Sequence, residues 1–164
     1  MLHTFCDSPL GELLIAGDEI GLRAILLPRE GQRRDPEPDW REDRRSLADA
    51  VAQLDEYFAG ERTTFDLRLA QPGTPFQLKV WSALRRIPYG ATLSYGELAA
   101  QIGRPKGSRA VGAANGRNQL PIVVPCHRVI QADGGLGGYA GGLPAKRALL
   151  GLERRVLASA AARA

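Results

Sequence analysis

The short segment Gln71-Pro72-Gly73 separates two stretches of the chain that differ in both pattern and charge. Before it, short apolar runs bounded by turn-forming residues are typical of β-strands, whereas after it apolar residues recur at helical spacing. Residues up to Ala70 include 9 Lys and Arg against 15 Asp and Glu, a net charge of −6, and the remainder include 13 against 3, a net charge of +10. We therefore predict an α+β protein with two domains, residues 1–72 and 73–164.

Composition excludes several classes of protein. With 164 residues, of which 44% are hydrophobic and 24% charged, the chain can bury a core without disulfides or a structural metal. Its apolar stretches are far shorter than the ~20 residues of a membrane span, and no basic-then-apolar leader opens it. Two cysteines 120 positions apart fit a reducing compartment. We expect a cytoplasmic protein with no membrane partner.

Metal binding is poorly supported by the ligands available. The soft ligands are His3, Cys6, Cys126 and His127, and they do not have the spacing of a zinc site. We expect no metal and no cofactor.

The N-terminal domain is predicted to be built mainly of strands, because turn-forming clusters such as Ser8–Gly11 separate its apolar runs. Its first three strands form an antiparallel meander in the simplest arrangement. The predicted elements are strands Leu2–Cys6, Glu12–Ala16 and Gly21–Leu27, a loop Pro28–Arg45, a helix Ser46–Ala59 and a strand Thr63–Ala70.

The C-terminal domain is predicted to be mainly helical. Capping boxes at Thr74–Gln77 and Ser94–Glu97 each open a helix, and the second helix ends at Gly103. A tight basic turn, Arg104–Gly107, leads to a helix that Ser108 caps and that runs from Arg109 to about Asn115. A last helix begins at Pro144 and ends near Glu153, and the tail Arg154–Ala164 is either helical or frayed.

The two short helices around the basic turn have the outline of a helix-turn-helix. The second of them is built from small residues, Arg109-Ala110-Val111-Gly112-Ala113-Ala114. Small side chains let a helix approach the groove of a nucleic acid closely, but they equally allow close packing against another helix. The basic charge of this domain favours nucleic acid modestly.

Chemistry is concentrated in Cys126-His127-Arg128, which lies in an apolar run between prolines and β-branched residues. An imidazole and a guanidinium near a thiol favour the thiolate, which is the nucleophilic form. Contact between these neighbours does not follow from adjacency, because successive residues of an extended segment point to opposite sides.

Two features downstream add to this candidate site. The segment Gln131–Leu143 has six glycines around Tyr139 and can wrap closely over a flat ligand. Glu153 is one of only three acids after Ala70, so we expect it to pair with His127 or with an arginine.

Three of these segments together resemble the O6-alkylguanine-DNA alkyltransferases, the methylated-DNA–protein-cysteine methyltransferase family. They are Val124–Ile130, which includes the specific signature PCHRV, the preceding Arg109–Gly112, and Gly138–Leu143. The likeness extends from about Thr74 to Glu153, about half of the chain. For the N-terminal half it implies a ribonuclease H-like domain, an assignment that rests only on the position of this half before the matching segment.

The resemblance implies direct repair of DNA with a single turnover. The alkyl group of O6-alkylguanine, and of O4-alkylthymine as a second substrate, would pass irreversibly to Cys126. His127 would activate the thiol through a water, Glu153 would orient the imidazole, and Tyr95 would donate a proton to the base. Asn118 corresponds to the hinge residue that links the recognition helix to the active-site segment.

The partner that the resemblance implies is double-stranded DNA containing an alkylated guanine, which would be flipped out of the helix. Tyr139 and backbone groups at Val129 and Ala140 would recognise the base, and Arg109 would enter the stack in its place. We expect a monomer, with cooperative assembly on DNA left open. The implied DNA contacts are Arg109, Ala110, Gly112, Ala113, Ser94, Lys106 and Arg128.

The sequence departs from the family pattern at three points. Gln119 replaces the proline that usually follows the hinge, Ala140 replaces a common serine, and the N-terminal zinc ligands of some relatives are absent. Two other hypotheses stay open. One is a lesion sensor or regulator in which Cys126 only packs, and the other is a cysteine hydrolase that uses Cys126 and His127.

Overall fold

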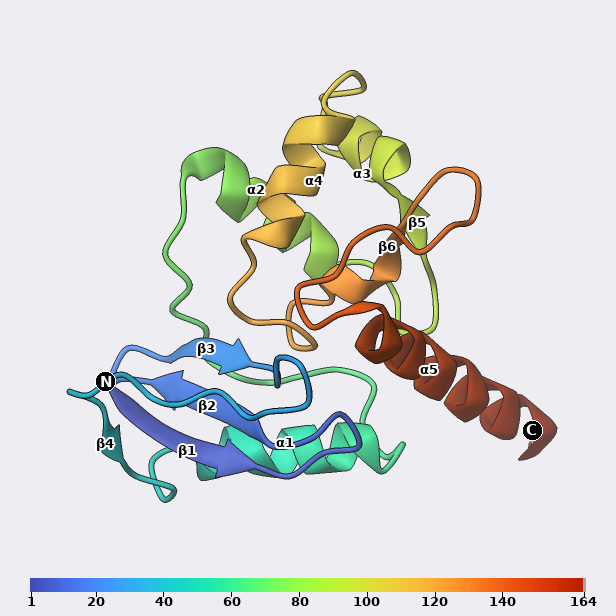
Figure 1. Ribbon diagram of the computed structural model, residues 1–164. Helices are drawn as coiled ribbons and strands as arrows, with labels where there is room; N and C mark the ends of the chain where they lie inside the picture. The colour runs from blue at the N-terminus through green and yellow to red at the C-terminus, as the bar shows by residue number, and fades with distance from the viewer. Residues whose placement is uncertain (164) are drawn as a thin grey trace. The chain divides into compact units, whose positions relative to one another are not determined.

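The computed structural model describes residues 1–163 and divides into two compact units, Met1–Pro72 and a second unit that begins at Gly73 (Figure 1). The first unit contains a sheet and one long helix, and the second is mainly helical. The predicted α+β class is thus confirmed.

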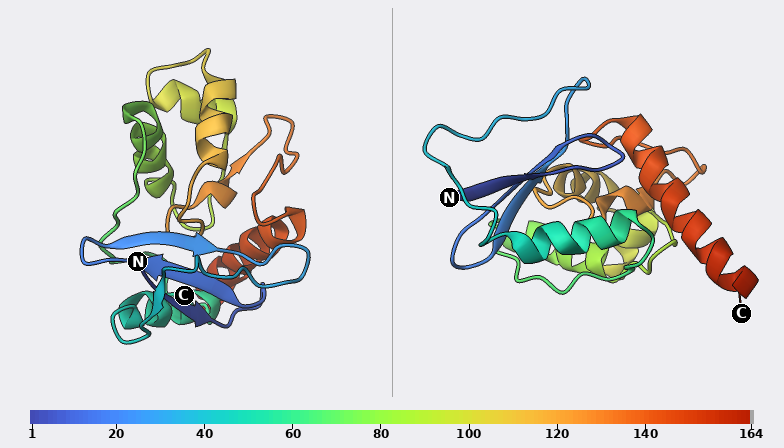
Figure 2. Two further views of the ribbon diagram at one scale, coloured as in Figure 1. Left: turned by 60° about the vertical axis from the view of Figure 1, so that its left-hand side comes forward. Right: turned by 90° about the horizontal axis from the view of Figure 1, so that it is seen from below.

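The first unit is a four-stranded sheet in the order β3-β2-β1-β4. Strands β1 (Leu2–Cys6), β2 (Leu13–Gly17) and β3 (Leu22–Leu26) form the predicted antiparallel meander. Gly11, with φ of +103°, allows the tight turn between β1 and β2. Helix α1 (Ala48–Phe58) lies along one face of the sheet (Figure 2).

Two predictions for the first unit are wrong. The expected loop Pro28–Arg45 contains a short strand, β4 (Arg41–Glu42), which pairs in parallel with β1. The expected strand Thr63–Ala70 forms only a single bridge, between Leu69 and Leu22. In the middle of this segment a side chain replaces a strand partner, because Gln53 donates to the Asp66 carbonyl at 2.9 Å and accepts from the Asp66 amide at 2.8 Å.

The second unit begins with two helices whose predicted capping boxes are both confirmed. Thr74 and Gln77 cap α2 (Pro75–Arg85), and Ser94 and Glu97 cap α3 (Tyr95–Gln101). The indole of the buried Trp81 on α2 donates to the Ala114 carbonyl at 2.9 Å. This bond ties α2 to the helix that follows α3.

That helix, α4 (Ser108–Gly116), completes the helix-turn-helix outline. Its first residue is Ser108, whereas its N-cap is Gly107, and no side chain caps it. The expectation that Ser108 is the cap is wrong, because Ser108 already has helical backbone. Val111 and Ala114 are buried, while Ala110 and Ala113 are exposed, so some small residues of α4 pack inside the unit and others lie on its surface.

A pair of two-residue strands holds the centre of the second unit. Strand β5 (Leu93–Ser94) pairs in parallel with β6 (Val129–Ile130), which follows a 3-10 turn, Cys126–Arg128. Because Tyr95 directly follows β5, this pairing places the start of α3 beside the segment that contains Cys126.

The last helix, α5 (Leu143–Arg163), extends ten residues beyond its predicted end near Glu153. The tail Arg154–Arg163 is therefore helical, as its Ala and Arg content allows, and Ala164 lies outside the described residues. Within residues 1–163, no helix has the length and apolar character needed to cross a membrane.

Candidate active site

A cavity of about 310 Å³ opens within the second unit. One wall comes from α3 and α4, the opposite wall from the loop between β6 and α5, and Cys126 contributes to the lining between them. The lining residues are Tyr95, Gly112, Asn115, Gly116, Asn118, Pro121, Cys126, Gly138, Tyr139 and Ala140.

Cys126 is buried, with 5% of its surface exposed. Burial raises the pKa of its thiol to about 11, although a hydrogen bond from Asn118 and the charge of Lys146 work in the opposite direction. At neutral pH the thiol therefore keeps its proton, and nucleophilic attack requires a base to remove it.

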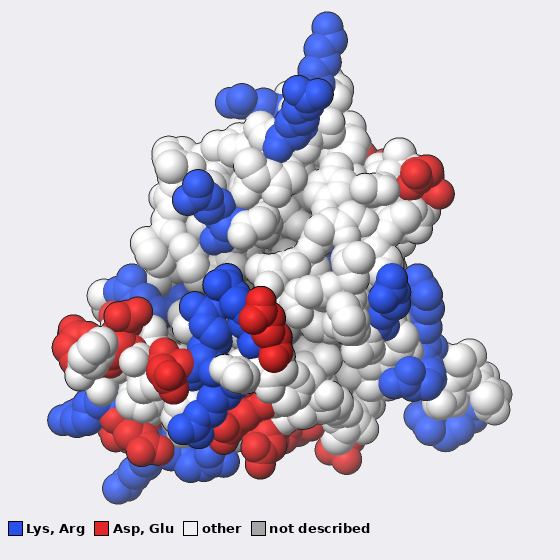
Figure 3. Space-filling view, in the orientation of Figure 1, with Lys and Arg blue, Asp and Glu red and all other residues white. Residues whose placement is uncertain are grey.

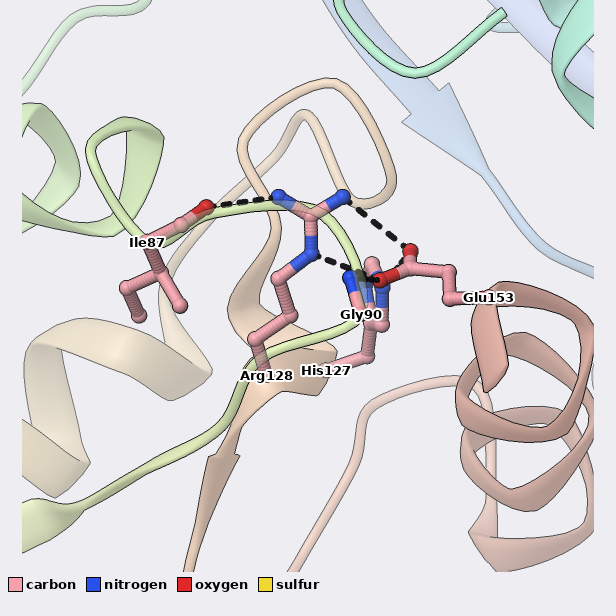
Figure 4. A network of polar contacts seen from close by, with 5 residues as sticks. All are labelled: Ile87, Gly90, His127, Arg128 and Glu153. Atoms are coloured by element: carbon pink, nitrogen blue, oxygen red, sulfur yellow. Dashed lines mark hydrogen bonds and ion pairs between the residues drawn. The ribbon is translucent and has the colours of Figure 1, made fainter. Parts of the chain in front are cut away.

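The Glu153 carboxylate is fully buried and is hydrogen-bonded to three residues, Arg128, Gly90 and His127 (Figure 4). Arg128 donates to it from Nε at 2.8 Å and from Nη2 at 3.1 Å, and the Gly90 amide donates at 3.0 Å. His127 Nε2 lies 2.6 Å from Glu153 Oε2. The expected pairing of Glu153 with His127 or an arginine is confirmed, and both partners are present.

These contacts set the ionisation of the cluster. Burial favours the neutral form of Glu153, but the hydrogen bonds and charges of His127 and Arg128 outweigh it and hold the pKa of the carboxyl well below 4.5. Burial lowers the pKa of His127 below 6.5 against the opposing influence of Glu153. The imidazole is therefore neutral at neutral pH and can accept a proton.

His127 has one ring nitrogen available for that proton. Nε2 faces Glu153, whereas Nδ1 is buried and has no hydrogen-bond partner within the part of the chain that the structure describes. Because Glu153 is ionised, Nε2 carries the hydrogen and Nδ1 is the acceptor.

Two tyrosines face the cavity as neutral phenols. Burial raises the pKa of Tyr95 and raises that of Tyr139 well above 10. Gly137, with φ of +71°, lets the loop cross over Tyr95, because a Cβ at this position would stand 2.9 Å from the tyrosine oxygen. The wall between α3 and the loop thus depends on a residue without a side chain.

Asn118 has the contacts of a structural hinge. Its Oδ1 accepts from the Leu120 amide at 3.0 Å, and its Nδ2 donates to the Val124 carbonyl at 2.8 Å. It therefore joins the end of α4 to the segment that leads into Cys126, while Gln119 beside it is exposed.

The other expected site residues are distributed between the cavity and the outer surface. Ala140 lines the cavity, whereas Val129 is fully buried in β6 and is not part of the lining. Lys106, Arg109, Ala110 and Ala113 are exposed, whereas Gly112 and Ser94 are half-buried. Basic side chains gather around the turn between α3 and α4, at the top of Figure 3.

Arg128 is the exception among the expected DNA contacts. Its side chain is 6% exposed, and Nη1 donates to the Ile87 carbonyl at 2.8 Å while the rest of the guanidinium holds Glu153. The expectation that Arg128 contacts DNA is wrong, because its donors are committed to the buried cluster.

Sequence reasoning missed Lys146, which is fully buried and donates to three backbone carbonyls, those of Val129, Leu136 and Gly138. A signal was present. Lys146, Leu149, Leu150 and Glu153 follow the i, i+3, i+4, i+7 spacing of a buried helix face.

A buried thiol that lines a cavity and is followed in the sequence by a neutral imidazole is suited to attack a group on a ligand held in that cavity. These features define a cysteine-based transferase or hydrolase, placed on a unit with a basic helix-turn-helix. Within residues 1–163, no three His, Cys, Asp or Glu side chains are grouped closely enough to hold a metal ion.

Comparison with known proteins identifies the family. Residues 75–155 match the DNA binding domain of 6-O-methylguanine DNA methyltransferase, and residues 1–71 match its ribonuclease-like domain. The chain is 51% identical to a methylated-DNA–protein-cysteine methyltransferase of Methanosarcina acetivorans, over 93% of this chain and 98% of that protein. It is 50% identical to the constitutive enzyme of Bacillus subtilis, over 93% and 94%.

A solved structure leads to the same family. Mycobacterium tuberculosis OGT in complex with DNA superimposes with a TM-score of 0.87 at 48% identity, covering 95% of this chain and 94% of that one. The chain belongs to the 6-O-methylguanine DNA methyltransferase family.

The buried cluster generates a prediction about stability. Replacing Arg128 with Met removes the bidentate partner of Glu153 and should lower the free energy of unfolding by about 3 kcal/mol at neutral pH. Glu153 has a folded-state pKa below its ordinary 4.5, so its contribution is present above that value and is lost as the pH falls toward the folded-state pKa. Urea unfolding should therefore show the difference from wild type shrinking below about pH 4.5.

The matched control is Arg154→Met, which removes an exposed arginine from α5 and should change the unfolding free energy by less than about 0.5 kcal/mol. A deficit in Arg128→Met that stays constant down to about pH 3 would mean that Arg128 acts by packing alone.

Proposed function

We propose that this protein repairs DNA directly by transferring the alkyl group of O6-alkylguanine to Cys126, once per chain and irreversibly. The observation that carries the proposal is the position of the Cys126 thiol in the lining of a cavity, followed in the sequence by His127, a neutral imidazole whose Nδ1 has no protein partner in the described chain. Family membership points to the same reaction.

In the first step, the Cys126 thiol gives its proton to His127 Nδ1 through a bridging water. A buried nitrogen without a protein partner is where such a water would bind. The imidazolium that forms is stabilised by the ionised Glu153, which also fixes the ring. The Asn118 side chain supports the charge that develops on sulfur.

In the second step, the thiolate attacks the alkyl carbon, a new S–C bond forms, and the C–O6 bond breaks with its electron pair going to the guanine. Tyr95 donates its hydroxyl proton to the ring as that bond breaks, and the phenolate regains a proton from the imidazolium or from solvent. The products are guanine and S-alkyl-Cys126, so no cofactor is consumed.

The flipped base would lie between α4 and the loop Gln131–Gly142. Tyr139 and Ala140 line this space, and backbone groups at Val129 and Ala140 would form hydrogen bonds with the base edge. The Val129 carbonyl already accepts from Lys146 at 2.7 Å, but a carbonyl oxygen has a second lone pair for the base.

DNA would bind along α4. The exposed Ala110 and Ala113, with the half-buried Gly112, let this helix enter the minor groove, and Arg109 takes the place of the extruded nucleotide in the stack. Lys106 and Ser94 lie where they can contact the phosphate backbone. Arg128 has no place in this interface.

The substrate is double-stranded DNA with an O6-alkylated guanine, and O4-alkylthymine is a second substrate. We propose that a monomer carries out the reaction and that further copies can assemble cooperatively along the DNA. A reducing compartment such as the cytoplasm would keep Cys126 available as a thiol.

The proposal is tested by the mass of the intact protein after incubation with a duplex that contains one O6-methylguanine. Wild type should gain one methyl group on Cys126 and saturate at one per chain. Cys126→Ser should gain none and should bind the same duplex with nearly unchanged affinity, because the sulfur is buried. Cys6→Ser is the matched control, since Cys6 is buried in the first unit, and it should react like wild type.

The two other hypotheses make different predictions in the same assay. Binding without methyl uptake by wild type would favour a lesion sensor, whereas repeated turnover on an ester or amide would favour a hydrolase. Methyl uptake by Cys126→Ser would exclude Cys126 as the acceptor.

A second prediction concerns base flipping. Arg109→Ala should slow methyl transfer from the duplex by more than about tenfold, because the vacated stack loses the side chain that offsets the cost of unstacking. Its reaction with free O6-benzylguanine, which needs no flipping, should stay within about twofold of wild type. Arg154→Ala, which removes an exposed arginine from α5, is the control for charge. Equal slowing of both reactions would mean that Arg109 acts in the cavity or is needed for folding.

A further inference from the structure

Lys146 on α5 is a lysine with no exposed surface. Its Nζ donates to the carbonyls of Val129 at 2.7 Å, Gly138 at 3.3 Å and Leu136. An ammonium group has three hydrogens, and Nζ of Lys146 has three carbonyl acceptors. Full hydrogen bonding lets a charged group remain buried.

The three carbonyls belong to the strand and loop that close one side of the cavity. Val129 is on β6, and Leu136 and Gly138 are in the loop Gln131–Gly142, whose Gly138, Tyr139 and Ala140 line the cavity. The backbone hydrogen bonds that the loop itself forms are local, such as Gln131 N to Gly135 O at 2.8 Å and Gly142 N to Tyr139 O at 2.9 Å. Lys146 therefore provides a hydrogen-bonded link between the middle of this loop and α5.

The charge of Lys146 also acts on the reactive sulfur. It lowers the pKa of Cys126. Burial lowers the pKa of Lys146 itself, and the charge of the Cys126 thiolate opposes that shift only in part. Arg128, the other buried cation of the second unit, is bound to Glu153 on the far side of His127.

We propose that Lys146 is a positioning residue that fastens the loop Gln131–Gly142 over the cavity and supplies the positive charge that favours the Cys126 thiolate. This proposal rests on the proposed function. Since all three of its hydrogens are held by carbonyls, Lys146 acts through the loop and through its field, not by touching the substrate.

The other groups around Cys126 do not supply this charge. Tyr95 at the start of α3 and Tyr139 in the loop remain neutral, because burial raises the pKa of both. His127 is neutral until it takes the thiol proton, and the Asn118 side chain is uncharged. Removing Lys146 should therefore raise the pKa of Cys126 further and move the reaction to higher pH.

The test compares Lys146→Met with Arg147→Met, which removes the same charge from the next position of α5 where the side chain is exposed. The rate of benzyl transfer from free O6-benzylguanine would be followed by intact mass from about pH 6 to about pH 11.5, a range that includes the pKa of about 11 of the Cys126 thiol. Lys146→Met should react at least about tenfold more slowly at neutral pH, with the rising limb of its pH profile about one unit higher, since one pKa unit changes the thiolate fraction tenfold. Arg147→Met should follow wild type.

A conservative variant separates charge from loop attachment. Lys146→Arg keeps the positive charge but has a different set of hydrogen-bond donors. The rising limb of its pH profile should therefore lie at the same pH as in wild type, even if the rate is lower. A Lys146→Met profile that is uniformly low with an unshifted limb would overturn the electrostatic role, and a wild-type rate would overturn the whole inference. Failure of wild type itself to accept the benzyl group would instead refute the proposed function.

A measurement on the unaltered chain keeps the inference testable even if Lys146→Met does not fold. The sequence has three lysines, Lys79, Lys106 and Lys146, so the Nζ signals of protein labelled with ¹⁵N-lysine can be assigned with the exposed variants Lys79→Arg and Lys106→Arg. The Lys146 ammonium should be protonated at neutral pH, and its hydrogens should exchange slowly with water because carbonyls hold all three. Rapid exchange, or an uncharged Lys146 at neutral pH, would contradict the proposal.

Discussion

The second unit depends on one buried carboxylate. Glu153 has no exposed surface, yet it is ionised, so each of its oxygens must be matched by donors. Those donors come from distant parts of the chain: Arg128 and His127 from the active-site turn, and Gly90 from the segment between α2 and β5. One requirement of electrostatics thus fixes α5, the active-site turn and the preceding segment together.

The structure gives neighbouring residues different tasks. Cys126 adjoins the cavity, His127 connects it to Glu153, and Arg128 faces away from the cavity to hold the carboxylate. This arrangement follows from the 3-10 turn, which rotates successive side chains around an axis. In an extended strand the same residues would alternate between two faces.

Local patterns predicted much of this fold, and contacts between distant residues account for the errors. The capping boxes at Thr74 and Ser94 could be predicted because both partners lie within four residues. The strand predicted at Thr63–Ala70 was wrong, and the segment bonds to the distant Gln53 instead. Arg128 was wrongly predicted to contact DNA, because its buried partners Ile87 and Glu153 are also distant in the sequence. Residues of the site could be named from the signature, but the roles of Arg128 and Lys146 required knowing which side chains α5 brings inward.

The spacing of Lys146 and Glu153 on α5 has a consequence for how this chain can vary in length. The two residues lie seven positions apart, about two helical turns, and both are fully buried. Inserting or deleting one residue between them would rotate one relative to the other by about 100° and turn a charged group out of the interior. Beyond Leu157 the helix is exposed. Insertions and deletions that the first turns of α5 cannot tolerate can therefore occur at its C-terminal end.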